Sequence, residues 1–258
     1  MSNILSFNMR NYYYKILLLS LALIFSLAFT NIALSKQEAY SVFAKLPILG
    51  EIEVQNIRTE LSIKEDNIKY SYYVNPTKVV DFFDDKISSG YITGKLVNNS
   101  IQTNKYYFKS EKKDFQRLIQ FEYLSGIINN ITIEPVYDIS KITKVTDQMI
   151  QESIDPVTMF YVLTNYNLIK KCNRTIKVYD GKRRYDLILS NPIETDIGYS
   201  CKLTHQKISG YKPEKIQENK KYISELKFKL RKDLTYEFSE VSLRVNNTDL
   251  TIRRDNYN

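Results

Sequence analysis

The sequence contains few of the residues on which catalytic and metal sites depend. Its 258 residues include one histidine and two cysteines. The single histidine, His205, excludes a histidine-based metal cluster and allows at most one nucleophile that depends on a histidine base. The chain also lacks a glycine-rich phosphate loop, a G-x-S-x-G motif and an H-E-x-x-H motif. We therefore expect a protein without catalytic activity, cofactor or metal ion.

Glycine and proline are also scarce, with seven and six residues in the whole chain. Flexible linkers are rich in glycine and turn-forming residues, and no such tract divides this sequence. Internal repeats and low-complexity tracts are missing as well. We therefore expect residues 36–258 to form a single domain, a length that suits one or two domains.

The charge balance is only mildly basic, at +8 for the whole chain and about +6 for residues 36–258, from 35 basic and 29 acidic residues. Nucleic-acid-binding proteins concentrate basic residues in one patch or motif. Here the bases are spread along strands, as at Lys227, Lys229 and Arg231. A solvated surface explains them better than an attraction to anionic lipid headgroups, which stays open. We expect no nucleic-acid partner.

Residues 1–35 have the features of an export signal. Arg10 and Lys15 form a positive flank, residues 16–34 are almost wholly apolar, and residues 33–35 offer a cleavage site before Lys36. The alternative is an uncleaved inner-membrane anchor, because the apolar run approaches the length that spans a bilayer. Either arrangement exports the remaining chain, so we expect a periplasmic location, with membrane contact only through this segment. The absence of a cysteine near the cleavage site disfavours a lipoprotein anchor.

The remaining chain has the pattern of successive β-strands separated by turns. Residues 115–123 alternate apolar and polar side chains, and residues 90–97 and 101–108 form a hairpin pattern around Asn98-Asn99. Strands at this spacing predict a mainly β fold, a curved antiparallel sheet or open barrel. One helix is expected over residues 155–168, where Asp155 is a suitable N-cap and Pro156 suits the first helical position. This helix would cover one face of the sheet.

The stretch from Cys172 to Tyr211 gives the clearest hairpin. Asp180-Gly181 lies between two alternating runs and favours a two-residue turn that pairs Val178 with Arg183. Alternation then places one set of side chains on a common inner face, together with Phe160 of the helix. The predicted inner-face and ligand-lining residues are Phe160, Ile176, Val178, Arg183, Tyr185, Leu187, Tyr199, Leu203 and His205. For His205 a structural role is favoured over catalysis, and for Arg183 a place at the sheet edge over a place at a cavity mouth.

The two cysteines, Cys172 and Cys201, are expected to form a disulfide, because cysteines in an oxidising compartment usually pair. In a plain three-strand meander they would lie about 9.6 Å apart, beyond the limit of about 7 Å for a disulfide. The bond therefore requires the chain to bend near Cys172 or the third strand to pair elsewhere. Their spacing fits neither a zinc site nor a redox-active pair.

This region resembles the bacterial domain-of-unknown-function 3108 family, most clearly over residues 150–212 and more faintly back to residue 40. The matching positions are Asp155-Pro156, Cys172, residues 179–187, Cys201 and Gly210-Tyr211. The resemblance implies a β-rich protein of the cell envelope and supplies no catalytic residues. The expected fold is also similar to the periplasmic lipoprotein-carrier type, a curved sheet that holds an apolar ligand, although no motif carries that similarity.

Three functions follow from these patterns. The first is a non-enzymatic binding or carrier protein for an apolar or lipid-like ligand. This function is suggested by the tyrosine- and phenylalanine-rich inner faces of the sheet together with the export signal. The second is a structural or protein-interaction module of the envelope that uses exposed sheet edges. The third is an enzyme, which the residue inventory disfavours.

Overall fold

The computed structural model describes residues 34–46, 50–78, 86–97, 100–169, 172–217, 222–245 and 248–255. The chain divides into two compact units, Met1–Leu34 and Ser35–Asn258. The predicted export signal, residues 1–35, lies outside the described residues except for its last two positions. The following description concerns the second unit and the strand that leads into it.

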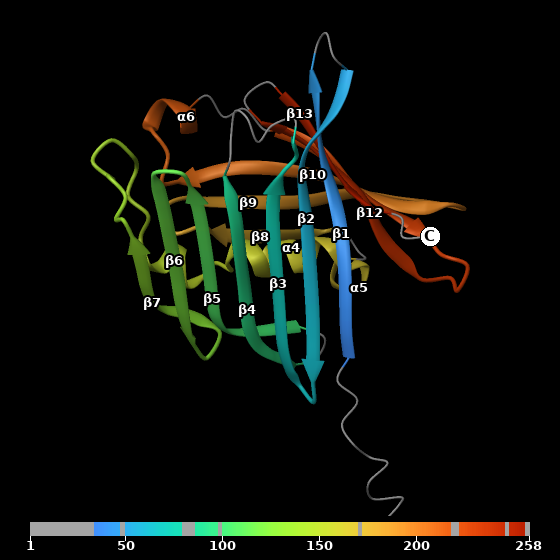
Figure 1. Ribbon diagram of the computed structural model, residues 1–258, viewed down its shortest axis with the longest axis horizontal. Coiled ribbons are helices and arrows are strands. Elements are labelled where there is room, and N and C mark those ends of the chain that lie inside the picture. Colours follow the sequence, from blue (N-terminus) through green and yellow to red (C-terminus); the bar gives the residue numbers. More distant parts are fainter. Residues whose placement is uncertain are drawn as a thin grey trace, which may run out of the picture. The chain divides into compact units, whose positions relative to one another are not determined.

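The described residues form one antiparallel sheet of thirteen strands (Figure 1). Strands β1 to β7 are neighbours in chain order, and β8 to β13 follow in reverse order beyond the β1–β13 pair. The strands are β1 (Leu34–Leu46), β2 (Gly50–Lys64), β3 (Asn67–Pro76), β4 (Ile87–Val97), β5 (Ser100–Lys112), β6 (Phe115–Leu124), β7 (Ile127–Glu134), β8 (Arg174–Tyr179), β9 (Arg184–Thr195), β10 (Gly198–Ser209), β11 (Tyr222–Leu230), β12 (Tyr236–Val245) and β13 (Thr248–Arg254).

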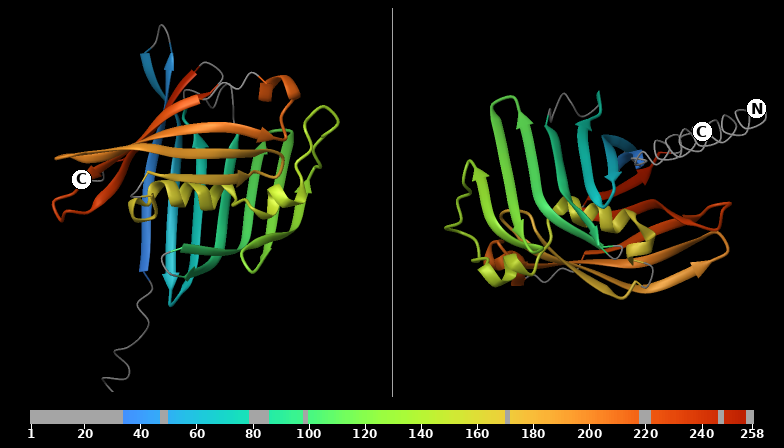
Figure 2. Two further views of the ribbon diagram at one scale, coloured as in Figure 1. Left: turned by 180° about the vertical axis from the view of Figure 1, so that it is seen from behind. Right: turned by 90° about the horizontal axis from the view of Figure 1, so that it is seen from below.

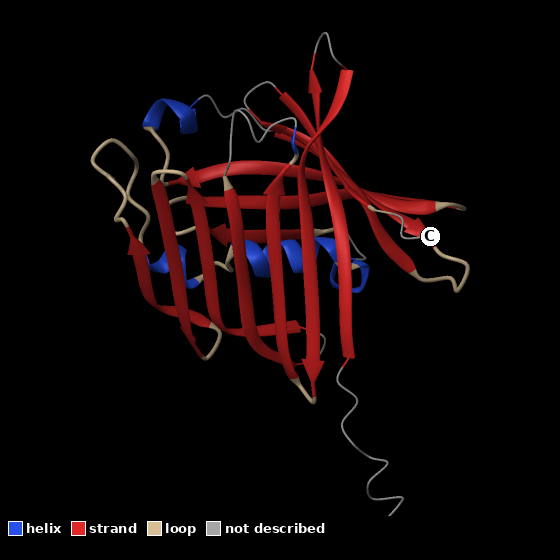
Figure 3. Cartoon of the chain, in the orientation of Figure 1, coloured by secondary structure: helices blue, strands red, loops and turns tan. Residues whose placement is uncertain are grey.

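The sheet bends into two layers that face each other. Its turning point is the pair of β1 and β13, where Val42 lies opposite Ile252. Figure 2 shows helix α4 (Pro156–Thr164) between the two layers, and Figure 3 shows how little of the chain is helical. The end strands β7 and β8 are not paired with each other, so the sheet is not closed. The prediction of a mainly β, curved antiparallel sheet with a covering helix is confirmed.

Helix α4 begins where the sequence predicts. The Asp155 side chain accepts hydrogen bonds from the backbone N–H groups of Val157 and Thr158, at 2.9 and 2.8 Å. The predicted single helix over 155–168 is instead two helices, because Asn165 has an extended backbone. Its side-chain oxygen then accepts from the Asn167 N–H at 3.2 Å, at the start of α5 (Tyr166–Ile169). The other described helices are α3 (Asp147–Gln151) and α6 (Pro213–Gln217).

The hairpin around Asp180-Gly181 has a longer turn than predicted. Tyr179 pairs with Arg184 and Val178 with Tyr185, so four residues rather than two connect the strands. The Asp180 carboxylate accepts from the N–H groups of Lys182 and Arg183, at 2.9 and 2.6 Å, and this side-chain turn competes with the two-residue turn. The register moves by two residues, so the side chains of β9 stay on their predicted face.

The two cysteines lie at disulfide distance, with Cα atoms 5.7 Å apart. Cys201 is the fourth residue of β10, while Cys172 precedes β8 and has a positive φ of 37°. The chain therefore bends at Cys172, one of the two ways in which the distance in a plain meander can be shortened. Both side chains are buried in the core.

A group of hydrogen bonds connects the segment after β7 to the end of β10. We call the five residues that form them the latch: Thr143, Lys144, Ser209, Gly210 and Tyr211. The Thr143 N–H donates to the Tyr211 carbonyl at 2.8 Å, and the Ser209 hydroxyl donates to the Lys144 carbonyl at 2.7 Å. Gly210 has a φ of +80°, and a Cβ there would collide with the Lys182 carbonyl. The latch thus requires glycine at this position.

Candidate functional site

Most of the predicted inner-face residues do face the interior, where they are packed against other side chains. Phe160 is partly buried and contacts both core clusters of the molecule. Five others belong to the core cluster that fills the space between α4, α5 and strands β8 to β12: Ile176, Val178, Leu187, Tyr199 and Leu203. These residues form a close-packed core.

Tyr185 and His205 lie side by side at the margin of that core. Their ring centroids are 5.0 Å apart, and both side chains are partly exposed. Burial, together with the positive charges of Lys207 and Arg183, lowers the pKa of His205. Burial raises the pKa of the Tyr185 phenol. His205 has no metal-ligating cluster around it among the described residues.

The predicted inner-face position of Arg183 is wrong. Arg183 belongs to the four-residue turn rather than to β9, and its exposed guanidinium lies over the Tyr211 ring at 5.6 Å. The neighbouring Arg184 is the buried one, with 3% of its surface exposed. Its Nη1 donates to the Asp186 carboxylate at 2.5 Å and to the Tyr185 carbonyl at 2.6 Å. Arg184 therefore has a structural role.

A pocket of about 360 Å³ is lined by side chains of β3, β5 and β6, by the first residue of α4 and by the Asp180 turn. We call it the apolar pocket, because aromatic and aliphatic side chains form most of its wall. It is lined by Tyr72, Lys86, Tyr106, Phe108, Ser110, Lys112, Phe115, Arg117, Ile119, Tyr137, Pro156 and Asp180. None of the predicted ligand-lining residues is among them.

The wall of the apolar pocket includes one buried and one partly buried phenol, near the buried carboxylate of Asp155. Tyr72 and Tyr106 line the pocket, and burial followed by the charge of Asp155 raises the pKa of Tyr72. Burial also raises the pKa of Asp155, against the opposing effect of its hydrogen bonds. The Asp155 carboxylate accepts from the Tyr123 and Thr158 hydroxyls at 2.9 and 2.6 Å. Asp155 is not part of the pocket lining. Its hydrogen bonds fix the start of α4, where Pro156 contacts the pocket.

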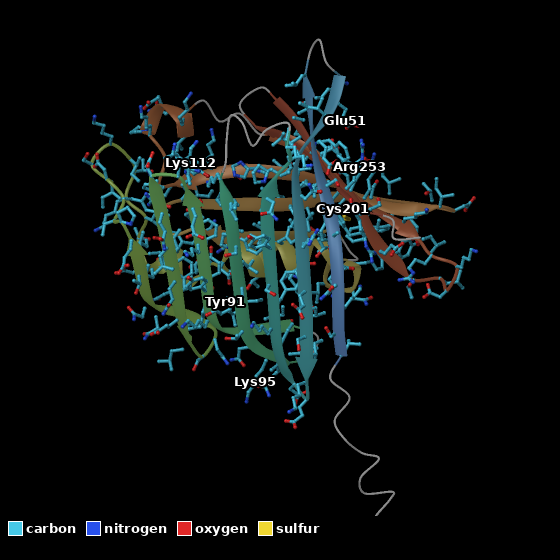
Figure 4. The ribbon with its side chains drawn as sticks, in the orientation of Figure 1. Glu51, Tyr91, Lys95, Lys112, Cys201 and Arg253 are labelled. Atoms are coloured by element: carbon cyan, nitrogen blue, oxygen red, sulfur yellow. A yellow bond between two sulfur atoms is a disulfide. The ribbon has the colours of Figure 1, made fainter. Side chains whose placement is uncertain are left out.

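Three cationic side chains belong to the lining of the apolar pocket: Lys86, Lys112 and Arg117. Lys112 is at the upper end of β5 in Figure 4. The Arg117 guanidinium stacks on the Tyr137 ring at 3.8 Å and lies 5.0 Å from the Phe115 ring. The pocket thus combines an apolar wall with positive charge.

A second pocket, of about 260 Å³, has a different chemistry, and we call it the polar pocket. Arg254 bridges Glu38 at 3.0 Å and also contacts Glu237, which lies 3.7 Å from Arg231. The Tyr70 hydroxyl at this site is buried and has no hydrogen-bond partner among the described residues. The lining is Lys36, Glu38, Thr59, Leu61, Tyr70, Tyr161, Thr164, Asn165, Tyr166, Asn167, Arg231, Thr235, Tyr236, Glu237, Phe238 and Arg254.

The sequence contained a signal for the apolar pocket that the prediction did not use. Phe115 and Ile119 alternate on one face of β6, and Tyr106 and Phe108 do the same on β5. This is the same pattern that marked the inner face of β8 to β10. Alternation identifies the inner faces, but it does not distinguish a face that is filled from one that is left open.

Two further features are absent from the described residues. No group of three or more histidine, cysteine, aspartate or glutamate side chains there has the arrangement of a metal site. None of the helices in that part of the chain has the length and apolar character needed to cross a bilayer.

Comparison with known proteins gives a family and a distant structural neighbour. No curated protein sequence matches the chain significantly. A crystal structure of a beta-barrel-like protein of domain of unknown function DUF1849 from Brucella abortus has a TM-score of 0.45 and 7% sequence identity, and the alignment covers 88% of this chain and 97% of that chain. That similarity is too low to indicate a function.

The family model described as "Protein of unknown function (DUF3108)" matches residues 40–197, which is more than half of the chain. The match includes the Asp155-Pro156 helix start and the Asp180 turn, and it extends further toward the N-terminus than the clearest part of the resemblance. It ends before Cys201 and the Gly210-Tyr211 pair. The chain belongs to the DUF3108 family of proteins of unknown function.

Proposed function

We propose that this protein is an exported, non-enzymatic binding or carrier protein that holds an apolar, lipid-like ligand in the apolar pocket. The observation that carries the proposal is the pocket itself, whose volume of about 360 Å³ lies within the range of ligand sites. Phe108, Phe115 and Ile119 give it an apolar wall. The sequence of residues 1–35 and the paired cysteines support an oxidising location outside the cytoplasm.

The first test is mass spectrometry of the protein purified gently from its own envelope, first native and then denatured. We expect an apolar molecule of definite mass that is released on denaturation. The binding of an added apolar probe then locates the site. Ser110→Phe should fill the pocket and abolish binding, whereas Ser71→Phe makes the same change on the opposite face of the sheet and should leave binding intact. Equal probe binding by both variants would exclude the apolar pocket.

A second candidate function is a protein-interaction module, and the end strand β7 favours it. Among the described strands β7 pairs only with β6, so its other edge can accept a strand from a partner. The two candidate functions predict different molecules in the purified protein, a bound apolar ligand or a bound protein partner. A bare polypeptide that copurifies with an envelope protein, and loses it when Thr132→Pro disrupts the β7 edge, would support the module over the carrier.

A further inference from the structure

We infer that the ligand of the apolar pocket is a single-chain amphiphile whose anionic oxygen head group binds at Lys86, Lys112 and Arg117. This inference rests on the proposed function and adds the chemical class of the ligand. A carboxylate and a phosphate head group share the required chemistry. Both present anionic oxygens that accept charge-assisted hydrogen bonds from lysine and arginine.

The first support is the charge of the lining. Three of the lining residues are cationic, and Asp180 is the one acidic residue among them. The Asp180 oxygen already accepts two backbone N–H groups, at 2.9 and 2.6 Å, so its carboxylate is engaged in the turn. Lys86 and Arg117 form no ion pair with any acidic residue of the described chain. The charges of Lys86 and Arg117 are therefore available to an external anion.

The second support is the way in which Arg117 is held. Its Nη1 donates to the Pro135 carbonyl at 3.3 Å, and its flat face stacks on Tyr137 at 3.8 Å. Lys182 approaches the same ring, with its Nζ 4.9 Å from the ring centroid. Stacking and one bond to a neutral carbonyl fix the guanidinium and leave other N–H donors for a carboxylate or phosphate.

The third support is the contrast with the polar pocket. There Arg254 is neutralised by Glu38 and Glu237, so the protein supplies the anions itself. At the apolar pocket, Arg117 stacks on Tyr137 and is not paired with an acidic residue of the described chain. The volume of about 360 Å³ is near the lower end of the range of ligand sites, about 300–1,000 Å³, which favours one alkyl chain over a two-chain lipid.

The test compares four probes with the same alkyl chain below their micellar concentrations: dodecanoate, dodecyl phosphate, dodecanol and dodecyltrimethylammonium. We expect the two anions to bind about tenfold more tightly than the alcohol, and the cation to bind most weakly. High salt should reduce the preference for anions. Acetate and inorganic phosphate alone, without a chain, should bind far more weakly than the amphiphiles.

Charge variants locate the head group. Arg117→Gln, Lys86→Gln and Lys112→Gln should each reduce the anion preference several-fold and leave dodecanol binding unchanged. The matched control is Lys95→Gln, which removes the same charge at the other end of the strands from Lys112 (Figure 4). Urea unfolding of each variant shows that the fold is retained.

The outcomes separate the two proposals. If dodecanol binds as tightly as dodecanoate, the head-group inference is wrong and the carrier function stands. If no probe binds, both are wrong. If inorganic phosphate binds as tightly as dodecyl phosphate, the site holds a free anion and the alkyl chain has no part in it, which also overturns the inference.

Discussion

The two layers of the sheet use similar side chains to different ends. We call strands β8 to β12 the packed half and strands β3 to β7 the pocket half. In the packed half, Val178, Leu203 and Leu226 are at most 1% exposed, and they pack with the cystine and the end of α4. In the pocket half, Ile92 and Phe121 are as deeply buried, but other side chains of β3, β5 and β6 line a pocket.

The two halves differ in which elements cover their apolar inner faces. Helices α4 and α5 lie between the layers, and the buried cysteines add volume on the side of the packed half. On the side of the pocket half, Pro156 at the start of α4 is the only residue of that helix that reaches the pocket lining. An apolar inner face is left open as a pocket where the covering helix ends.

A core truncation in each half should give the largest difference. We expect Leu203→Ala in the packed half to lower the free energy of unfolding by about 2–5 kcal/mol, because it leaves a cavity among rigid neighbours. Phe108→Ala on the pocket wall should cost less than half as much and should weaken binding of the apolar probe. Urea unfolding and probe titration measure both effects. Equal destabilisation would mean that the halves are packed alike.

Removal of the disulfide should lower the stability of the packed half and leave the apolar pocket unchanged. The double variant Cys172→Ser and Cys201→Ser removes a bridge across a sequence separation of 29 residues. The loss of stability expected from chain entropy is about 3–4 kcal/mol. The folded variant should still bind the apolar probe with unchanged affinity. The contrary result, a large loss of affinity with little loss of stability, would show that the cystine shapes the pocket.

Asp155 should affect both halves, because it holds the start of the helix between them. Asp155→Ala leaves the Tyr123 and Thr158 hydroxyls and two N–H groups without their acceptor. We expect a loss of about 2–3 kcal/mol in unfolding free energy together with weaker probe binding. Asp155→Asn keeps one capping oxygen and should lose less. If Ala and Asn behave alike in urea unfolding, the cap is not the main contribution.

The smallest effect is expected from pH, at the margin of the packed half. Burial lowers the pKa of His205 below its ordinary value of 6.5, so the unfolded chain takes up a proton at a higher pH than the folded chain. Stability from this residue is therefore complete above pH 6.5 and declines as the pH falls through that value. His205→Gln should flatten the decline between pH 7.5 and 5.5. A steeper decline in the variant would contradict this assignment.

The sequence predicted the faces of the sheet better than its turns or its pocket. Alternation placed Ile176, Val178 and Leu187 correctly on an inner face, because a strand has a fixed period of two. The Asp-Gly pair predicted a two-residue turn, but the Asp180 side chain caps a longer one, and this displaced Arg183 from the inner face. Side-chain competition of this kind is not visible in an apolar–polar pattern.

The pocket was missed for a different reason. Its wall comes from β3, β5 and β6 together with Tyr137, Pro156 and Asp180, which are far apart in the sequence. Whether such residues meet depends on where the sheet bends and where α4 begins. The Asp155-Pro156 pair predicted the start of the helix correctly, but local spacing does not report how far the opposite strands extend past it.

The latch has a consequence for how a guest molecule exchanges. Hydrogen bonds from Thr143 and Ser209 join the segment after the end strand β7 to the end of β10, which is the third strand from the other end of the sheet. The segment after β7 therefore cannot move away from β10 unless these bonds break. Under the proposed function, a ligand would enter and leave through the mouth of the apolar pocket while these hydrogen bonds stay in place. The exchange rate of the proposed ligand should therefore depend on the side chains at the mouth of the pocket and not on opening of the sheet.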